Sequence, residues 1–202
     1  MHPSPPSETA LLVIDMMNLF DFDGGTALAK SAITCSRAIR RLRDRFDKAG
    51  APVIYVNDNF SNWQGDFREL IAACQTSDGP SSTISRALSP RAGHYHILKP
   101  KHSAFLGTPL AILLTKLGVQ RLVLTGISAD SCILSTATDA NMREMELWIP
   151  GDAVAAITRD RKAKALSLIK ASLGGDIRGT RAIRTLFPDA PASPQTALTS
   201  SL

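Results

Sequence analysis

Short apolar runs alternate with longer segments of helical periodicity along this chain, and that order restricts the class of fold it can adopt. The first two runs, residues 10–15 and 52–57, are too short and too apolar for surface helices, which predicts two strands buried in a parallel sheet. Between them, apolar residues recur every three or four positions, and Gly50 follows as a helix stop. Together these segments predict one βαβ unit.

The same alternation continues along the rest of the chain. Further strands are expected at residues 95–98, 121–125, 146–149 and 176–178. Further helices are expected at residues 110–117, 131–143 and 166–173. This order predicts an α/β fold with three αβα layers, in which right-handed crossovers connect a mainly parallel sheet of about six strands. The 202 residues suffice for a single domain, expected at 9–185, with loose tails at 1–8 and 186–202.

The net charge of +5 is concentrated in two segments with a helical pattern. Residues 158–184 hold eight basic and two acidic residues, and residues 37–48 hold six basic and two acidic residues. Apolar residues occupy the opposite face of both segments, and aromatic side chains do not alternate with the charges. This pattern favours solvated outer helices or an oligomer contact over nucleic-acid binding.

The apolar runs are also too short for a membrane protein. None approaches the roughly 18 to 20 residues that cross a bilayer. Asp15 lies in the first apolar run and no basic residue precedes it, which is unlike a secretory signal. We therefore expect a cytoplasmic protein that binds neither membrane nor nucleic acid.

The three cysteines are an odd number at wide spacing, which makes neither a disulfide framework nor a zinc site. Cys35 and Cys74 lie within helical patterns, as small core residues commonly do. At least one thiol is therefore free.

Three reactive side chains fall at the ends of three expected strands. Asp15 closes the first, Lys99 follows the third, and Cys132 lies just past the fourth. Because sites in parallel sheets lie beyond the carboxyl ends of the strands, these residues should converge. A buried carboxylate at Asp15 needs a partner, and Lys99 is the natural one. Equally, Asp15 can cap a following helix.

The surroundings of Cys132 suggest a nucleophile. Gly126 provides a tight exit from the preceding strand, and Ser128 or Asp130 can cap the helix that begins beneath the thiol. The free N–H groups and the dipole of a helix N-terminus favour a thiolate and can hold an oxyanion.

Several motifs resemble the isochorismatase-like cysteine hydrolases over roughly residues 9–180. They are IDMMN at 14–18, KPKHSAF at 99–105, GISADSC at 126–132 and TATDA at 136–140. The stretch IYVNDNFSNWQGDF at 54–67 is similar to one subgroup of these hydrolases whose substrates are mostly unassigned. The resemblance implies the Rossmann-like sheet of that family.

The same resemblance implies roles for individual residues. A catalytic triad is carried over onto Asp15, Lys99 and Cys132. A cis peptide bond between Ile127 and Ser128 would direct the Ser128 N–H, together with the Cys132 N–H, toward an oxyanion. Relatives that cleave the isochorismate vinyl ether lack the nucleophilic cysteine, so Cys132 favours amide, ureido or carbamoyl substrates.

Two positions depart from the family pattern. Met17 stands where relatives often have Gln, which removes a polar contact. Nicotinamidase-like members bind a metal through an Asp and several His near the second strand, whereas here Asp58 is followed by Asn59 and Phe60. No carboxylate is spaced to complete a site with the histidines around the third strand, which are interpreted as solvated or core residues: His94, His96 and His102. No metal or other cofactor is expected.

The sequence thus predicts a metal-independent amidohydrolase with a small-molecule substrate, and the resemblance suggests a homo-oligomer, a dimer or larger. Candidates for the pocket wall are Phe20, Asn59, Phe60, Trp63 and Phe105. The alternatives are a binding or assembly module without turnover and a redox-responsive thiol protein.

Overall fold

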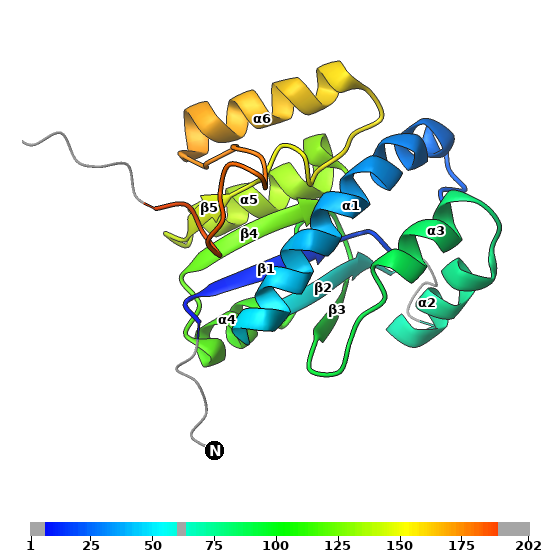
Figure 1. The fold of residues 1–202 in the computed structure, drawn as a ribbon, viewed down its shortest axis with the longest axis horizontal. Helices are drawn as coiled ribbons and strands as arrows, with labels where there is room; N and C mark the ends of the chain where they lie inside the picture. The colour runs from blue at the N-terminus through cyan, green and yellow to red at the C-terminus, as the bar shows by residue number, and fades with distance from the viewer. Residues whose placement is uncertain (1–6, 60–63, 190–202) are drawn as a thin grey trace, which may run out of the picture.

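Five parallel strands run through the centre of the molecule in the order β3-β2-β1-β4-β5 (Figure 1). The computed structural model describes residues 7–59 and 64–189. The strands are β1 Thr9–Ile14, β2 Val53–Asp58, β3 Tyr95–Lys99, β4 Arg121–Gly126 and β5 Glu146–Trp148. The helices are α1 Gly25–Ala49, α2 Phe67–Thr76, α3 Pro80–Ala87, α4 Leu110–Leu117, the π-helix η1 Ala129–Ile133, α5 Leu134–Asn141 and α6 Arg159–Leu173. The predicted α/β class is confirmed.

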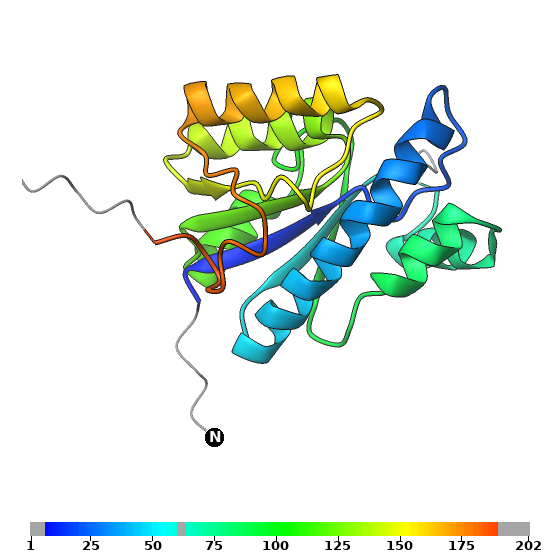
Figure 2. The same cartoon turned by 45° about the horizontal axis from the view of Figure 1, so that its top comes forward.

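Helices cover both faces of the sheet, which divides the core in two. In β1, Leu11 and Val13 point into one cluster with α1, α2 and α3, while Leu12 and Ile14 point into another with α4, α5 and α6. Figure 2 shows α5 and α6 side by side on one side of the sheet, with α1 on the other. Because both faces are covered, the strands read as continuous apolar runs.

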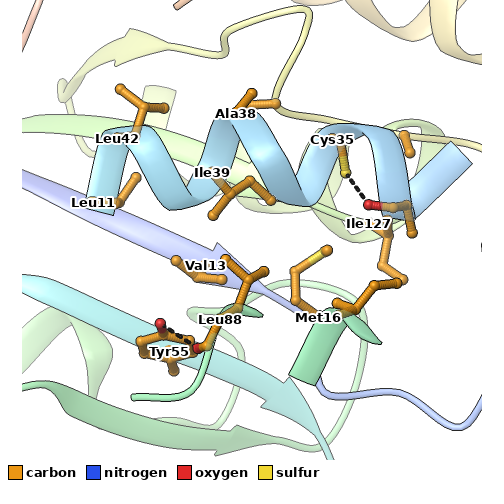
Figure 3. Packing of buried hydrophobic residues seen from close by; sticks show 14 of the residues in the cluster. Leu11, Val13, Met16, Cys35, Ala38, Ile39, Leu42, Tyr55, Leu88 and Ile127 are labelled. Atoms are coloured by element: carbon orange, nitrogen blue, oxygen red, sulfur yellow. Dashed lines mark hydrogen bonds between the residues drawn. The ribbon is translucent and has the colours of Figure 1, made fainter. Parts of the chain in front are cut away.

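In helix α1, the apolar residues that recur every three or four positions are the ones buried against the sheet. Cys35, Ala38, Ile39 and Leu42 are buried in the apolar cluster that α1 shares with Leu11 and Val13 of β1 (Figure 3). Gly50 ends the helix in a left-handed conformation, with φ of 65°, as predicted.

The expectation of a solvated basic face in segment 37–48 holds only in part, because Arg37, Arg40, Arg41 and Lys48 are exposed. Arg43 is buried and donates to the Ala87 and Ser89 carbonyls.

Helices α2 and α3, which connect β2 to β3, are not predicted as separate elements by the alternating pattern. They are only 10 and 8 residues long, so each shows barely two turns of periodicity. The sequence signal that marks α2 is a capping box, in which the Asp66 carboxylate accepts from the Glu69 N–H and the Glu69 side chain accepts from the Asp66 N–H.

The sixth strand expected at 176–178 is wrong. Asp176 pairs with Trp148 in a single isolated bridge, and the described part of the chain has five strands. The Asp176 carboxylate accepts a hydrogen bond from the Arg178 N–H at 2.8 Å, a local turn contact that competes with strand pairing. The helix expected at 131–143 also differs, because its first turn is the separate π-helix η1.

Both expected tails contact the domain where the structure describes them. The Glu8 carbonyl accepts from the N–H groups of Gln120 and Arg121, each at 2.9 Å. Leu186 and Phe187 pack against the α1 side of the core. Among the helices that the structure describes, none is sufficiently long and apolar to cross a membrane.

The carboxyl ends of β1 and β4 form the topological switch point of the sheet, since the chain continues from β1 to β2 on one side and reaches β4 on the other. Gly126, the last residue of β4, has φ of 115°. A Cβ added there would lie 2.0 Å from the Ile14 carbonyl oxygen. Only glycine allows the two strand ends to approach this closely.

Substitution of Gly126 by alanine is therefore expected to lower the free energy of unfolding by about 3 kcal/mol or more, because backbone strain and a steric clash act together. Gly118 is the matched control, since it also has positive φ but no atom lies within 4 Å of an added Cβ. Gly118→Ala is expected to cost only about 1 kcal/mol. Urea denaturation measures both values, and equal losses in the two variants would contradict the role of the close approach.

Candidate active site

Three strand ends bring together the residues that the sequence singles out. Asp15 follows β1 directly, Lys99 is the last residue of β3, and Cys132 lies in η1, just past β4. Strand β2 lies between β1 and β3, so its last residue, Asp58, joins them at the same edge. The predicted convergence is observed.

Lys99 is the centre of this cluster. Its Nζ atom lies 2.9 Å from Asp15 Oδ2, 3.6 Å from Asp58 Oδ2 and 3.5 Å from Cys132 Sγ. The side chain is fully buried. Burial by itself would lower the pKa of Lys99, but Asp15, the thiol and Asp58 hold it above its ordinary value. Lys99 is therefore a permanent buried cation, whereas Lys101 two residues on is exposed.

Asp15 is paired with Lys99 and caps no helix, because α1 begins only at Gly25. Its Oδ1 atom accepts a hydrogen bond from the Asp58 N–H at 2.7 Å. Burial raises the pKa of Asp15, while Lys99 and the hydrogen bonds oppose this shift. A carboxylate with a raised pKa is a stronger proton acceptor than an exposed one.

Cys132 does not show the lowered pKa that a helix N-terminus suggests. Burial and the nearby Asp15 carboxylate raise the pKa of the thiol to about 12, although Lys99 pulls it down. Desolvation and a neighbouring negative charge outweigh the helix dipole here. Burial therefore favours the neutral form of the Cys132 thiol at neutral pH.

The turn before Cys132 has a distinctive backbone. The peptide bond between Ile127 and Ser128 is cis. The Ser128 carbonyl accepts from the N–H groups of Ser131 and Ile133, each at 3.1 Å, and the Ala129 N–H donates to Ala155. These bonds hold the turn beneath the thiol.

The Asn57 side chain binds the backbone of Met17, the residue that stands where relatives often have Gln. The Asn57 side chain donates to the Met17 carbonyl at 2.7 Å and accepts from the Met17 N–H at 3.4 Å. The Met17 side chain is fully buried in the α1 core. The loop after Asp15 is therefore held by a neighbouring strand instead of by a side chain at position 17.

The expected pocket wall is only partly found. Phe20 and Phe105 are buried in the cores on opposite faces of the sheet, so they do not form one open wall. Asn59 is half-buried beside the site, and its N–H donates to the Lys99 carbonyl at 3.2 Å. Phe60 and Trp63 lie outside the described residues.

The structure also places His102 at the site, which the sequence interpretation missed. Its Nδ1 atom lies 3.9 Å from Cys132 Sγ and 3.1 Å from Ser131 Oγ. The available signal was its position three residues after Lys99 in the KPKHSAF motif. The other two histidines are elsewhere: His94 binds Asp47 and His96 stacks on Phe67.

Asp58, at the position where nicotinamidase-like proteins have a metal-binding Asp, is paired with Lys99 in this structure. Asp58 Oδ2 faces the Lys99 ammonium at 3.6 Å, where a second cation would be repelled. Within residues 7–59 and 64–189, no group of three or more His, Cys, Asp or Glu side chains is arranged to hold a metal ion.

Comparison with known proteins agrees with this geometry. The model of the isochorismatase domain family matches residues 9–181. The "uncharacterized isochorismatase family protein YaaI" of Bacillus subtilis is 36% identical over 171 residues, covering 85% of this chain and 93% of that protein.

Two solved structures share the fold. An isochorismatase family protein from Desulfovibrio vulgaris has a TM-score of 0.71 and 25% identity, covering 87% of this chain and 95% of its own. The N-carbamoylsarcosine amidase from Thermoplasma acidophilum has a TM-score of 0.67 and 28% identity, and the match covers 89% of this chain and 100% of the amidase chain. The residues at the strand ends, the fold and these matches lead to one conclusion: the chain belongs to the isochorismatase family.

Proposed function

We propose that this protein is a cysteine hydrolase that cleaves the C–N bond of a small amide, ureido or carbamoyl substrate through a thioester intermediate. The observation that carries the proposal is the position of the buried Lys99 ammonium, 2.9 Å from the Asp15 carboxylate and 3.5 Å from the Cys132 sulfur. A nucleophile, a base and a cation thus lie within contact distance of one another.

Acylation begins with a neutral thiol. Asp15 takes the proton from Cys132 as the sulfur attacks the substrate carbonyl, since a thiol with a pKa of about 12 needs a base at neutral pH. Lys99 stabilises the negative charge that passes from Asp15 to the sulfur. The backbone N–H groups of Ser128 and Cys132 hold the oxyanion of the tetrahedral intermediate.

The thioester forms when the C–N bond breaks. Asp15 returns the proton to the departing nitrogen, which leaves as ammonia or an amine. Water then attacks the thioester carbonyl, the C–S bond breaks and the thiol is regenerated. The carbamoyl class is included because the N-carbamoylsarcosine amidase shares 28% of its residues and the fold with this chain.

Ammonia release from small primary amides, ureido acids and carbamoyl compounds is the test of this function. We expect one of these classes to be hydrolysed, with an acyl group on Cys132 that mass spectrometry detects after acid quenching. Failure of all three classes, together with the absence of an acyl group on Cys132, would favour a binding module without turnover.

Hydrolysis is further expected to survive exhaustive treatment with EDTA. The reason is that the Asp58 carboxylate is paired with Lys99, and the described residues hold no group of three or more His, Cys, Asp or Glu side chains arranged for a metal ion. The measurement compares the rate before and after chelation and after addition of zinc or iron. Loss of activity with EDTA and recovery with either metal would contradict this expectation.

A further inference from the structure

Two basic helix faces border one cavity that lies outside the active site. The cavity has a volume of about 490 Å³ and lies between the first half of α1 and the first turn of α6. Three cations line it, Lys30 from α1 together with Arg159 and Lys162 from α6. Figure 2 shows these parts of the two helices at the same end of the molecule. None of the triad residues is among the lining residues, so this cavity is a second candidate site.

Positive charge continues beyond the cavity along α1. Thr34, Arg37 and Arg41 follow Lys30 at intervals of three or four residues, which places all four side chains on one stripe of the helix. Arg37 and Arg41 are exposed. The basic residues that the sequence shows at 37–48 and 158–184 therefore contribute to one positively charged region.

Among the described residues that line the cavity, one carboxylate faces these cations. Asp152 Oδ2 lies 4.0 Å from Arg41 Nη2. The same carboxylate accepts hydrogen bonds from the Thr180 N–H at 2.7 Å and from Thr180 Oγ1 at 2.6 Å. A single negative charge that is also bound by Thr180 offsets only part of the positive charge in this region.

The remaining cations are uncompensated. Within residues 7–59 and 64–189, four of them have side chains that form no hydrogen bond or ion pair: Lys30, Arg37, Arg159 and Lys162. Lys162 is half-buried, and burial lowers the pKa of its ammonium, a shift that its neighbours oppose only in part. Like charges without partners repel one another, so an anion that enters the cavity stabilises the folded protein.

The lining residues fit the phosphate group of a small molecule. Arg and Lys side chains bind phosphate oxygens, and Ser31 and Thr34 add hydroxyl groups on the α1 wall. The volume is typical of small-molecule pockets and exceeds that of a bare phosphate ion. No aromatic side chain lines the cavity among the described residues, unlike sites that stack nucleic-acid bases. We propose that the cavity between α1 and α6 binds a small phosphomonoester, with its phosphate group beside Arg159 and Lys162.

One wall of the cavity also holds the turn that precedes Cys132. Residues 154–156 line the cavity. The Ala129 N–H donates to the Ala155 carbonyl at 2.8 Å, and the Ala155 N–H donates to the Gly126 carbonyl at 3.1 Å. A ligand that binds only the closed form of this wall suppresses its opening. The bound phosphomonoester is therefore expected to slow hydrogen exchange of the Ala129 amide.

Isothermal titration calorimetry with glycerol 3-phosphate and with inorganic phosphate tests the site, at an ionic strength kept constant with sodium chloride. For the wild type we expect one saturable site that binds glycerol 3-phosphate more tightly than inorganic phosphate, because the cavity is larger than the ion. The double variant Arg159→Gln/Lys162→Gln should bind both probes about 10²-fold more weakly, since it loses two charge-assisted contacts of about tenfold each. Glycerol 3-phosphate should not slow exchange of the Ala129 amide in this variant.

The matched control is Arg68→Gln/Lys116→Gln. It removes the same net charge from exposed positions of α2 and α4 outside the cavity. Its affinity for both probes should equal that of the wild type. Glutamine is a good helix former, so both double variants should fold, and their unfolding temperatures without ligand check this.

Absence of saturable binding by the wild type, or equal weakening in the two double variants, would overturn the inference. Tighter binding of inorganic phosphate than of glycerol 3-phosphate would overturn the phosphomonoester and assign the cavity to the free anion. Tighter binding of a single-stranded oligonucleotide than of either probe would assign the two basic faces to nucleic acid instead. None of these measurements depends on hydrolysis, so their result is independent of the proposed function.

Discussion

Substitution of Cys132 by alanine is expected to abolish hydrolysis, with kcat lowered by about 10⁴-fold or more. The variant retains Asp15 and Lys99 at 2.9 Å but has no atom that can form the thioester. Little volume is lost and the carboxylate keeps its cation, so the thermal unfolding temperature should change by only a few degrees. Ammonia release and the unfolding temperature are the two measurements.

The control for this variant is Cys35→Ala. Cys35 is equally buried, but it lies in α1, donates to the Ala32 carbonyl at 3.3 Å and belongs to the apolar cluster on the other face of the sheet from Cys132. Its substitution should leave kcat unchanged. Hydrolysis at close to the wild-type rate by Cys132→Ala would exclude the thioester mechanism.

Loss of the buried cation is the second large effect. Lys99→Met is expected to lower kcat by about 10²- to 10³-fold, because the negative charge that moves from Asp15 to the sulfur loses its stabilising partner. It should also raise the pKa of the Cys132 thiol above its present value of about 12, since Lys99 lowers that pKa. Lys101→Met should change KM at most, because Lys101 is exposed.

Alkylation of Cys132 by iodoacetamide measures the thiol directly. Only the thiolate reacts, so the wild-type rate should rise with pH toward about 12 instead of reaching a plateau near neutrality. The Lys99→Met curve should lie at higher pH and therefore show a slower rate at any fixed alkaline pH. Lys99→Gln provides a second variant that keeps a hydrogen-bond donor, should methionine prevent folding.

The assignment of Lys99 depends on the comparison between the two lysines. A curve shifted by Lys101→Met and unchanged by both Lys99 variants would reverse it. Lys99 ends β3 and Lys101 lies in the bend that follows it. The motif resemblance assigns Lys99 to the triad, and burial separates the two lysines in the folded chain, since Lys99 is fully buried and Lys101 is exposed.

Much of the fold could be read from local patterns. Strands β1, β2, β3 and β4 lie within one residue of their expected bounds. β1, β2 and β4 are buried on both faces and so read as apolar runs, whereas the edge strand β3 is exposed at Tyr95 and His96. The apolar pattern did not predict the short helices α2 and α3. It also predicted a strand at 176–178, where the structure has a single bridge at Asp176. The conformation of these segments depends on capping and turn contacts that leave little periodicity.

The three triad candidates could likewise be predicted from the order of strands along the chain. In a parallel sheet, the carboxyl ends of strands must share one edge, so Asp15, Lys99 and Cys132 had to approach one another. Their motif spacing also carried the resemblance to the family. The chemical types and the rough location of the site are thus properties of the sequence itself.

Tertiary structure alone decided the electrostatics and the neighbours of that site. The direction of the Cys132 pKa shift follows from burial and the distance to Asp15, neither of which is encoded near residue 132. His102 reaches the sulfur only because its loop is attached to α5 through Ser103 and Asp139. Sequence periodicity reports which face of an element is apolar, whereas desolvation and Coulomb energies depend on distances between segments that only the packed chain brings together.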